Sequence, residues 1–502
     1  MLRSILFYII YTMSFVSLGM LIVISLMKPQ DNLFSWQMIL GVIGFTVLLF
    51  LVFVIWKKVC AKINKASWLF PLLTVLFGLS LFIVSCIGRN DPASSDDYGR
   101  VWNAAQSLAR GEEIQDEYYL MNYSNNIKPM LLLYLTFKLA ISIGLDDPFY
   151  IILLINVIGV IASIMGIQYL LYNDKGRRFS IPIIGCYLCC LPIWAMTQTF
   201  YTDAMSISIS VVIIALAKKV LSCESKKTSI FLCFLMGIIL TLGISIKVTI
   251  LIPVIAASMV YFLMRHGSLN KQIFGYLGCV LVSFVISYTI FNIWSNTFEI
   301  TKASKLTEDP VITWIGLGLK ADGSFHGNKD YIYTVHGFET KAEKLEYCKA
   351  YIRDNFRYFF NGEHIVAKIR CTYASGHLGS AEFSFIAKNK DNILWQLFSP
   401  WGKFYWRASQ IGFCYLHALF SVCFFGNIVT VYRFIKSKEV SKTLMMLDLS
   451  ILGYFIFLLI WESNNRQLYN MLPILIGAAI LNGNHIIDFF MSLRKSNNNQ
   501  KG

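Results

Sequence analysis

Long apolar segments constrain the fold of this chain more than any other feature of its sequence. Hydrophobic residues make up 56% of its 502 positions, and charged residues make up only 15%. A helix of about 17 to 25 apolar residues is long enough to cross a hydrocarbon core of roughly 30 Å. Because lipid cannot satisfy backbone hydrogen bonds, each spanning segment must satisfy its own. We therefore expect an all-α polytopic membrane protein.

Apolar runs of spanning length predict about twelve transmembrane helices. They fall at residues 4–27, 36–56, 68–87, 148–172, 180–200, 203–217, 229–245, 248–264, 272–294, 408–433, 444–461 and 468–487. Residues 129–143 are also apolar, but counting them as a span would move the basic loop at 173–178 to the outside. We therefore expect this segment to lie at the outer interface or to dip into it.

The positive charge of the chain, +15 net, is concentrated in short connections between the expected spans. The basic residues of these connections are Lys57, Lys58, Lys62, Lys65, Lys175, Arg177, Arg178, Lys218, Lys219, Lys226, Lys227, Arg265, Lys271, Arg433, Lys436, Lys438, Lys442, Arg494 and Lys495. The positive-inside rule assigns such connections to the cytoplasm. We therefore expect a multi-pass protein of the cell (plasma) membrane with both termini in the cytoplasm. Because the basic residues lie in these short connections, their distribution argues against nucleic acid as a partner.

The expected spans divide the chain into five parts. These are N-terminal helices at 1–87, a first external loop with interfacial helices at 88–147, a transmembrane core at 148–294, a larger mixed external loop between spans nine and ten at 295–406, and C-terminal helices with a cytoplasmic tail at 407–502. The other connections are short, so functional residues are expected in the two external loops and at the span ends beside them. Cys348 and Cys371 share the larger loop, and their spacing leaves a disulfide between them open.

The first external loop opens with two adjacent carboxylates, Asp96 and Asp97, close behind a span. Acidic residues at the start of a helix can simply cap it. The same loop also carries Glu112, Glu113 and, directly before a proline, Lys128. A carboxylate at the membrane surface can act as a general base toward a hydroxyl, and a nearby ammonium can balance a phosphate. This combination suits chemistry between a polar acceptor and a phosphate headgroup carried in the lipid.

The order of these features resembles the first external loop of the GT-C superfamily of polyprenyl-linked-sugar glycosyltransferases. It comprises an acidic pair after a membrane helix, A-A-x-x-L-x-x-G, an aromatic-rich stretch, N-N-x-K-P and an apolar interfacial helix. The bacterial members akin to aminoarabinose transferases and protein O-mannosyltransferases are the most similar. They move a sugar from a lipid phosphate to an acceptor on the outer face, with inversion at the anomeric carbon. Ile127 stands where the aminoarabinose-type pattern has an acid, which argues against a metal ligand there.

The resemblance also assigns roles to individual residues. It implies that Asp97 or Asp96 removes the proton of an acceptor hydroxyl, and the spacing to Gly111 fits either aspartate. The candidates for stabilising the leaving phosphate are basic residues expected at the outer interface, namely Lys128, Arg466 and Lys247, and any of them can instead be an interfacial anchor. The resemblance implies that the acceptor, or a Mg²⁺ or Mn²⁺ ion, is positioned by Asp203, Tyr201, Glu112 and Glu113. Whether a metal ion takes part stays open.

Other interpretations remain for the same sequence. Asp203 can cap the span that follows it, and Lys247 can be an interfacial anchor. An O-antigen-type polysaccharide polymerase would rely on arginines in its large external loop, whereas here the acids of the first loop dominate. A lipid or glycan transporter usually places ionisable residues at the bilayer midplane. The expected spans hold few of these, and Asp448 lies toward a cytoplasmic end.

The expected function is therefore that of an inverting membrane glycosyltransferase with a catalytic first external loop. Its expected partners are a polyprenyl-phosphate-linked sugar donor, membrane lipid, and a glycan, lipid or protein acceptor of the cell envelope. Its active site is expected on the extracytoplasmic face, where the first loop and the larger loop both lie.

Overall fold

The computed structural model of the protein describes residues 2–27, 36–63, 68–89, 97–145, 147–172, 179–263, 271–380, 391–438 and 441–499. Within these ranges all regular structure is helical and no strand occurs, so the expected all-α polytopic membrane fold is confirmed. Ten described segments are long and apolar enough to cross a membrane. They are formed by α1 (Leu2–Met27), α2 (Trp36–Ile63), α3 (Leu69–Ile87), α7 (Phe149–Leu171), α10 (Thr202–Ser206) with α11 (Ile209–Ser222), α12 (Lys226–Ile246), α14 (Lys271–Ser295), α22 (Tyr405–Ser437), α23 (Lys442–Ile460), and η5 (Asn465–Met471) with α24 (Leu472–Asn499).

The two other expected spans are shorter than predicted. The segment at 180–200 divides into α8 (Ser180–Cys189) and α9 (Leu191–Met196), with Pro192 in the first turn of α9. Proline lacks a backbone N–H and its ring clashes with a preceding helical turn, so it starts a helix well but interrupts a continuing one. The segment at 248–264 holds the 3₁₀ turn η3 (Val248–Ile250) and α13 (Leu251–Leu263), a shorter apolar helix.

The first loop folds into short helices that lie beside the membrane bundle. They are α4 (Asp97–Arg110), α5 (Glu117–Asn122), η2 (Ser124–Asn126) and α6 (Ile127–Ser142). The helix α6 packs along α4 and falls outside the ten spanning segments, as expected for residues 129–143. Its depth in the membrane stays a prediction.

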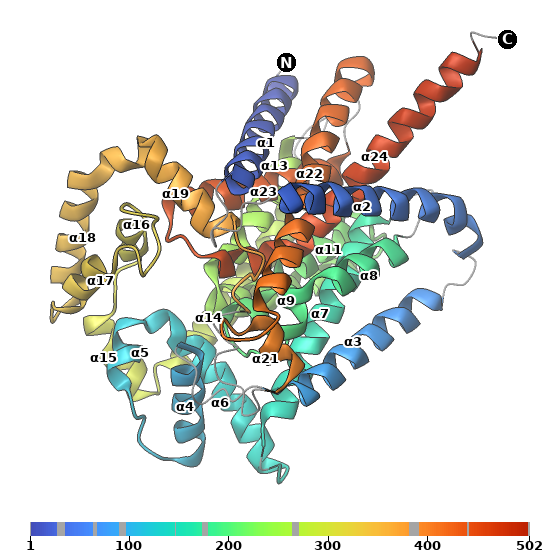
Figure 1. The fold of residues 1–502 in the computed structure, drawn as a ribbon. Coiled ribbons are helices and arrows are strands. Elements are labelled where there is room, and N and C mark those ends of the chain that lie inside the picture. Colours follow the sequence, from blue (N-terminus) through green and yellow to red (C-terminus); the bar gives the residue numbers. More distant parts are fainter. Residues whose placement is uncertain are drawn as a thin grey trace.

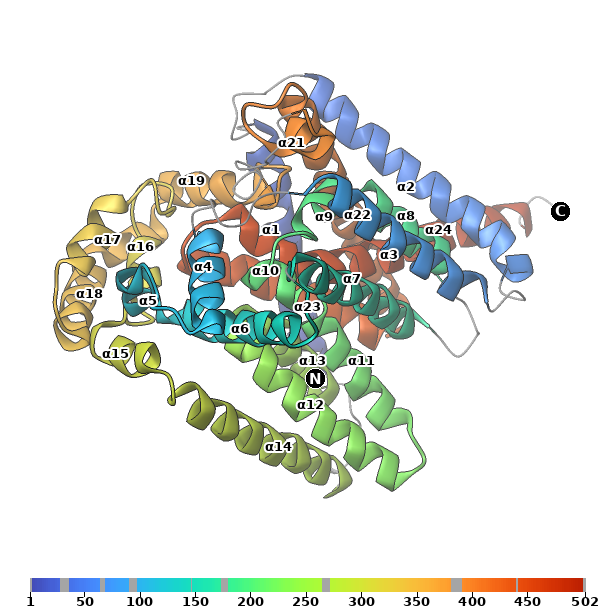
Figure 2. The ribbon, with the colours of Figure 1, turned by 90° about the horizontal axis from the view of Figure 1, so that it is seen from below.

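The larger loop is also helical in its described part, so the mixed structure expected for it is not seen there. Its helices are α15 (Glu299–Thr307), α16 (Thr313–Leu317), α17 (Lys329–His336), α18 (Lys341–Asn355), η4 (Phe356–Phe360), α19 (Gly362–Tyr373) and α21 (Ile393–Phe398). The helix α18 begins with a capping box in which Thr340 and Glu343 bond each other's backbone N–H groups. Figure 1 shows α15 to α19 beside α4 and α5, and in Figure 2 this end of the bundle lies opposite the C-terminus.

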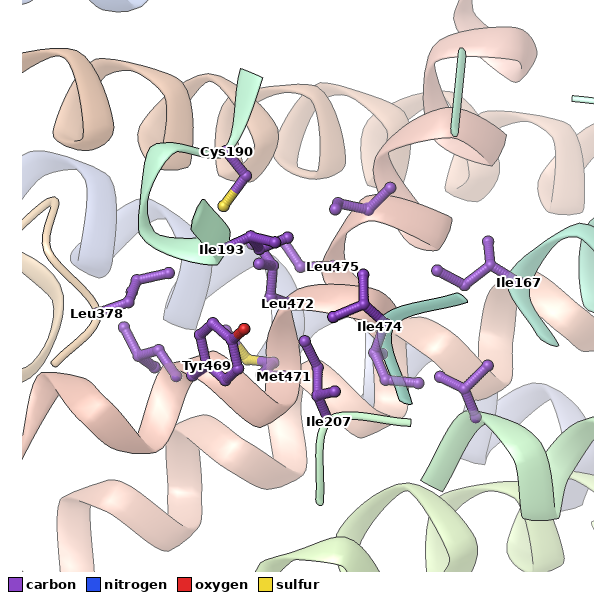
Figure 3. Close-up of a cluster of buried hydrophobic side chains, with 14 of the residues drawn as sticks. Ile167, Cys190, Ile193, Ile207, Leu378, Tyr469, Met471, Leu472, Ile474 and Leu475 are labelled. Carbon is purple, nitrogen blue, oxygen red and sulfur yellow. The ribbon is translucent and has the colours of Figure 1, made fainter. Parts of the chain in front are cut away.

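The core around η5 fixes one end of the last span. Tyr469, Leu472 and Leu475 are almost fully buried. They pack against Ile193 of α9 and Leu378 of the segment after α19, as Figure 3 shows. Because such cores are close-packed, side chains that project from this stretch have fixed positions.

The two cysteines of the larger loop are not joined. Cys348 and Cys371 are both free thiols. The Sγ atom of Cys348 lies 3.1 Å from the Tyr331 hydroxyl, and burial raises the pKa of the Cys348 thiol. The Sγ atom of Cys371 lies 3.8 Å from the carbonyl oxygen of Ser463. The disulfide that the spacing left open is therefore absent from this structure.

Candidate functional site

Four charged side chains from four distant parts of the chain meet next to α4. We call Asp97, Asp203, Lys247 and Arg466 the four-charge cluster. The Nε atom of Arg466 lies 3.1 Å from Oδ2 of Asp203, and its terminal nitrogen lies 3.9 Å from Oδ2 of Asp97. The ammonium of Lys247 forms an ion pair with Oδ1 of Asp203. Asp203 thus holds both cations, and Arg466 connects the two carboxylates.

Breaks between helices place these side chains. Lys247 follows the last residue of α12 and has extended backbone angles (φ −158°, ψ 120°), so it leaves the helix. Asp203 is the second residue of α10, which begins after the equally extended Tyr201. Arg466 lies in the first turn of η5, where its N–H donates to the side chain of Asn464. The end of α12 and the starts of α10 and η5 therefore supply three members of the cluster.

The side chains of the four-charge cluster differ in their exposure to solvent. The side chain of Asp203 is 0% exposed, and those of Lys247 and Arg466 are 11% and 15% exposed. The side chain of Asp97 is 40% exposed. Its position as the first residue of α4 also stabilises its negative charge, because helix N-termini favour anions. Asp97 is therefore the carboxylate of the cluster that a substrate can reach.

The Tyr201 hydroxyl contacts the Asp97 carboxylate, and the Asn126 amide contacts that hydroxyl. The Tyr201 hydroxyl lies 3.5 Å from Oδ2 of Asp97 and 3.3 Å from Oδ1 of Asn126. Asn126 in turn donates to the Tyr119 hydroxyl at 2.7 Å. Burial, and next the nearby Asp97 charge, raise the pKa of Tyr201, so its phenol stays protonated and donates. The guanidinium of Arg466 lies 5.1 Å from the centre of the Tyr201 ring.

A glycine fits against the stem of Arg466. Gly379 has φ +83°, and a Cβ atom there would come within 2.8 Å of the Arg466 Cβ atom. The segment that carries Gly379 is itself held close to α22, where the backbones of Gly376 and Gly412 touch. Only glycine adopts this conformation at low cost and leaves space for the arginine. Position 379 therefore helps to fix the Arg466 side chain.

Three predicted site residues do not join the four-charge cluster. Lys128 donates to the Tyr288 hydroxyl at 3.2 Å and lies over the Tyr288 ring, instead of contacting the cluster. Glu112 and Glu113 are exposed after the C-terminus of α4, whereas Asp97 starts that helix. At 1.5 Å per residue the 14-residue helix separates them from Asp97 by about 20 Å. The structure therefore does not bring these two carboxylates together with Asp97. Asp96 lies outside the described residues.

The donor set of the cluster does not suit a divalent cation. Both oxygens of Asp203 face cations, one each from Lys247 and Arg466. Within the described ranges no group of three or more His, Cys, Asp or Glu side chains could hold a metal ion. Mg²⁺ and Ca²⁺ take several oxygen ligands, and a site already neutralised by two bases repels them. The expected alternative of a Mg²⁺ or Mn²⁺ ion at Asp203 does not fit this geometry.

A second charged cluster joins the first loop to the larger loop. We call Asn122, Asp309, His336 and Lys344 the Lys344 cluster. The Lys344 ammonium lies 2.6 Å from Oδ1 of Asn122 and 2.9 Å from Oδ1 of Asp309. The other oxygen of Asp309 lies 2.9 Å from Nε2 of His336. Beside them the ring of Tyr123 stacks on Trp314 with centres 5.9 Å apart.

Sequence reasoning missed several of these contacts. Asn126 belongs to the N-N-x-K-P motif, which was recognised as a pattern without a role for its second asparagine. Tyr119 belongs to the aromatic stretch before it, and the Tyr119–Asn126 hydrogen bond gives both residues a role beside Asp97. Nothing in the local sequence marks Gly379, because its contact with Arg466 exists only in the folded chain.

Comparison with known proteins places the chain in a family. A family model described as a conserved hypothetical integral membrane protein matches residues 1–486, so the chain belongs to that family. No curated protein and no solved structure matches it. The protein is thus an integral, multi-pass membrane protein, in agreement with its ten spanning segments.

Proposed function

We propose that this membrane protein is an inverting glycosyltransferase of the GT-C type. It transfers a sugar from a polyprenyl-phosphate donor to a glycan, lipid or protein acceptor of the cell envelope. One observation carries the proposal: a reachable carboxylate, Asp97, lies 3.9 Å from the guanidinium of Arg466, which shares the buried Asp203 with Lys247. In this proposal the cluster faces the extracytoplasmic side of the plasma membrane, and both termini are cytoplasmic.

Asp97 is the general base of the proposed reaction. Its carboxylate accepts the proton of an acceptor hydroxyl while that oxygen attacks the anomeric carbon of the donor. The bond from the anomeric carbon to the phosphate oxygen breaks on the opposite face, and the polyprenyl phosphate leaves with the bonding electron pair. The Tyr201 hydroxyl holds the carboxylate in place without competing for its negative charge, because the phenol stays protonated.

The two cations suit the leaving phosphate. Negative charge develops on the phosphate as its bond to the sugar breaks, and fixed cations lower the energy of that state. Arg466 can present two nitrogens to a phosphate, whereas Lys247 acts as a point charge. Asp203 is then a positioning residue, because it holds Arg466 and Lys247 side by side. Lys128 has no part in this step, since its contact is with Tyr288.

Sugar transfer measured in membranes tests the proposal. Membranes that contain the wild type, Asp97→Asn or Asp96→Asn are incubated with a radiolabelled polyprenyl-phosphate-sugar extract, and label in envelope material is counted. We expect transfer by the wild type and its loss in Asp97→Asn at equal expression. Glu113→Gln is the matched control, because it removes a carboxylate charge from the far end of α4. Loss confined to Asp96→Asn would assign the base to Asp96, and full transfer by both variants would reject the proposal.

A lipid or glycan transporter is the second candidate, because Asp448 in the spanning helix α23 is only 2% exposed. Transporters use such intramembrane acids. A flippase assay on purified protein in vesicles, with no acceptor present, separates the two classes. The polymerase alternative is less favoured, since the arginine of the cluster lies in η5 and outside the larger loop.

A further inference from the structure

A buried lysine of the larger loop binds the end of a spanning helix. Lys368 of α19 is 1% exposed. Its ammonium donates to the carbonyl oxygen of Gly318 at 2.9 Å and to that of Trp461 at 2.7 Å. Gly318 follows α16, which lies beside α19 in Figure 1, and Trp461 follows α23. Burial lowers the pKa of Lys368 to about 8, so the ammonium is charged at neutral pH and makes strong hydrogen bonds.

Backbone contacts reinforce this junction. We call residues 318–323 the glycine turn, and residues 461–464 the α23–η5 connection. The Ser463 N–H donates to the carbonyl oxygen of Gly323 at 2.8 Å. A Cβ atom at Gly318 would lie 2.6 Å from the Trp461 oxygen, and one at Gly323 would lie 2.6 Å from the Lys368 ammonium. The glycine turn therefore packs directly on the α23–η5 connection, and Lys368 contacts both.

A second side chain of α19 contacts the glycine turn. His364 precedes Lys368 by four residues, and positions four apart lie on the same face of a helix. The two ring nitrogens of His364 lie 2.9 Å from the carbonyl oxygen of Ala321 and 3.0 Å from that of Gly318. One face of α19 thus fixes the glycine turn, and Lys368 extends this contact to the α23–η5 connection.

The α23–η5 connection leads directly to Arg466. Asn464 is its last residue, and the Asn464 side chain accepts the N–H of Arg466 at 2.9 Å. The stem of Arg466 also contacts Gly379, which lies in the segment after α19. The Nε atom of Arg466 lies 3.1 Å from Oδ2 of Asp203. The larger loop therefore constrains the arginine both through the backbone before it and through the packing of its stem.

We propose that Lys368 is a positioning residue for Arg466, through which the larger loop sets where the guanidinium meets the donor phosphate. The role of the phosphate rests on the proposed function, whereas the position of Arg466 rests on the contacts alone. Lys368 contacts the glycine turn and the α23–η5 connection, so it acts on Arg466 through the chain between them. A misplacement of about 1 Å in a reacting group can cost about 10²-fold in rate. Loosening this junction therefore lowers transfer while every charge of the four-charge cluster is retained.

Hydrogen exchange in the purified full-length protein tests the positioning without any substrate. The amides of Ser463 and Arg466 are both hydrogen-bonded, which protects them from exchange. Lys368→Met removes the ammonium and keeps a long apolar side chain. We expect both amides to exchange at least about tenfold faster in this variant. Lys349→Met is the matched control, because Lys349 is exposed on α18, and its exchange should equal that of the wild type.

Donor kinetics test the effect on transfer. In Lys368→Met we expect transfer to be about tenfold slower, with a raised KM for the donor and an unchanged KM for the acceptor. A smaller folded fraction would lower the maximal rate and leave both KM values unchanged. Arg466→Gln should lower transfer further. The double variant should be no slower than Arg466→Gln alone, because Lys368 acts through that arginine.

Several outcomes overturn the inference. Unchanged exchange at Ser463 and Arg466 in Lys368→Met does so whatever happens to transfer, and so do slower transfer with an unchanged donor KM and additive losses in the double variant. If the wild type transfers no sugar, the proposed function fails alone, and exchange still decides whether Lys368 positions Arg466. If Lys368→Met does not elute from a sizing column like the wild type, Gly323→Ala carries both tests, because its methyl group would press on Lys368 and Ser463. Gly362→Ala is then the control, since a Cβ atom there meets nothing within 4 Å.

Discussion

The four-charge cluster and the Lys344 cluster use the same chemistry and differ in exposure. Each pairs a buried base with an aspartate, and each joins segments that are far apart in the sequence. In the Lys344 cluster both partners are sealed, because the side chains of Lys344 and Asp309 are 1% and 2% exposed. In the four-charge cluster Asp97 is 40% exposed. A sealed pair can hold loops together, whereas a reachable carboxylate can also accept a proton.

The two clusters also differ in how completely their charges are paired. The Lys344 cluster joins the first loop to the larger loop, because the Lys344 ammonium donates to Asn122, Thr307 and Asp309. Its contribution to stability depends on all three contacts being present. A buried charge that loses its partner is strongly destabilising. In the four-charge cluster Asp203 already neutralises much of the positive charge, which leaves Asp97 only loosely paired at 3.9 Å. We therefore expect rate effects from one cluster and stability effects from the other.

Replacing Asp97 by asparagine should have the largest effect of any single substitution. Removal of a general base costs about 10²- to 10⁴-fold in rate. The variant keeps its melting temperature, because a partly exposed carboxylate in a loose ion pair contributes little to stability. Initial rates of transfer from the labelled donor and thermal melting in detergent measure the two effects. If the variant loses transfer and also melts at a clearly lower temperature, Asp97 contributes to stability as Lys344 does, and the expected difference between the two clusters is wrong.

Replacing Lys344 by methionine should show the reverse pattern. The substitution leaves Asp309 and Asn122 buried without their cation, and breaking such a pair costs about 3–5 kcal/mol of stability. The melting temperature is expected to fall clearly, and a protease should cleave the larger loop faster than in the wild type. Lys341→Met is the matched control, because that lysine is 45% exposed in its pair with Glu308 and should change neither property. Loss of transfer without loss of stability in Lys344→Met would make this cluster part of the reaction.

The sequence predicted the framework of the site better than its interior. Apolar runs identified ten spanning segments correctly, because hydropathy acts over a whole helix. The sequence indicated Asp203, Lys247 and Arg466 because each lies at the end of an expected span, and Asp97 because it belongs to the acidic pair of the first external loop. The helix break within 180–200 was not predicted, because hydropathy is continuous across this apolar run and does not register Pro192.

Grouping the residues was harder than naming them. Glu112 and Glu113 are close to Asp97 in the sequence, yet a straight helix carries them to its other end. Lys128 is adjacent to the first loop motif, yet its side chain turns to Tyr288 of α14. The contact between Gly379 and Arg466 joins residues 87 positions apart, which no local pattern encodes. Pairwise geometry of this kind arises only from tertiary packing.

Replacing Gly379 by alanine should have an intermediate effect. The residue has φ +83°, and its new methyl group would press on the Arg466 stem. A non-glycine residue in this conformation costs about 1–2 kcal/mol, and displacement of the guanidinium should lower transfer about tenfold. Gly185→Ala is the control, because a Cβ atom at that position meets nothing within 4 Å. Equal transfer by both variants would show that Arg466 needs no support from this side.

Chelation of divalent cations should have the smallest effect, with transfer changing by less than about twofold. The positive charge beside Asp97 comes from side chains, which chelators do not remove. Membranes are treated with EDTA, washed and assayed with and without added Mg²⁺ or Mn²⁺. Retained transfer would mean that Arg466 and Lys247 together supply the charge that a metal ion would otherwise provide. Loss that only a metal ion restores would mean that Asp203 releases its two bases during the reaction. The four-charge cluster would then be a resting arrangement, and only the Lys344 cluster would keep its pairing throughout.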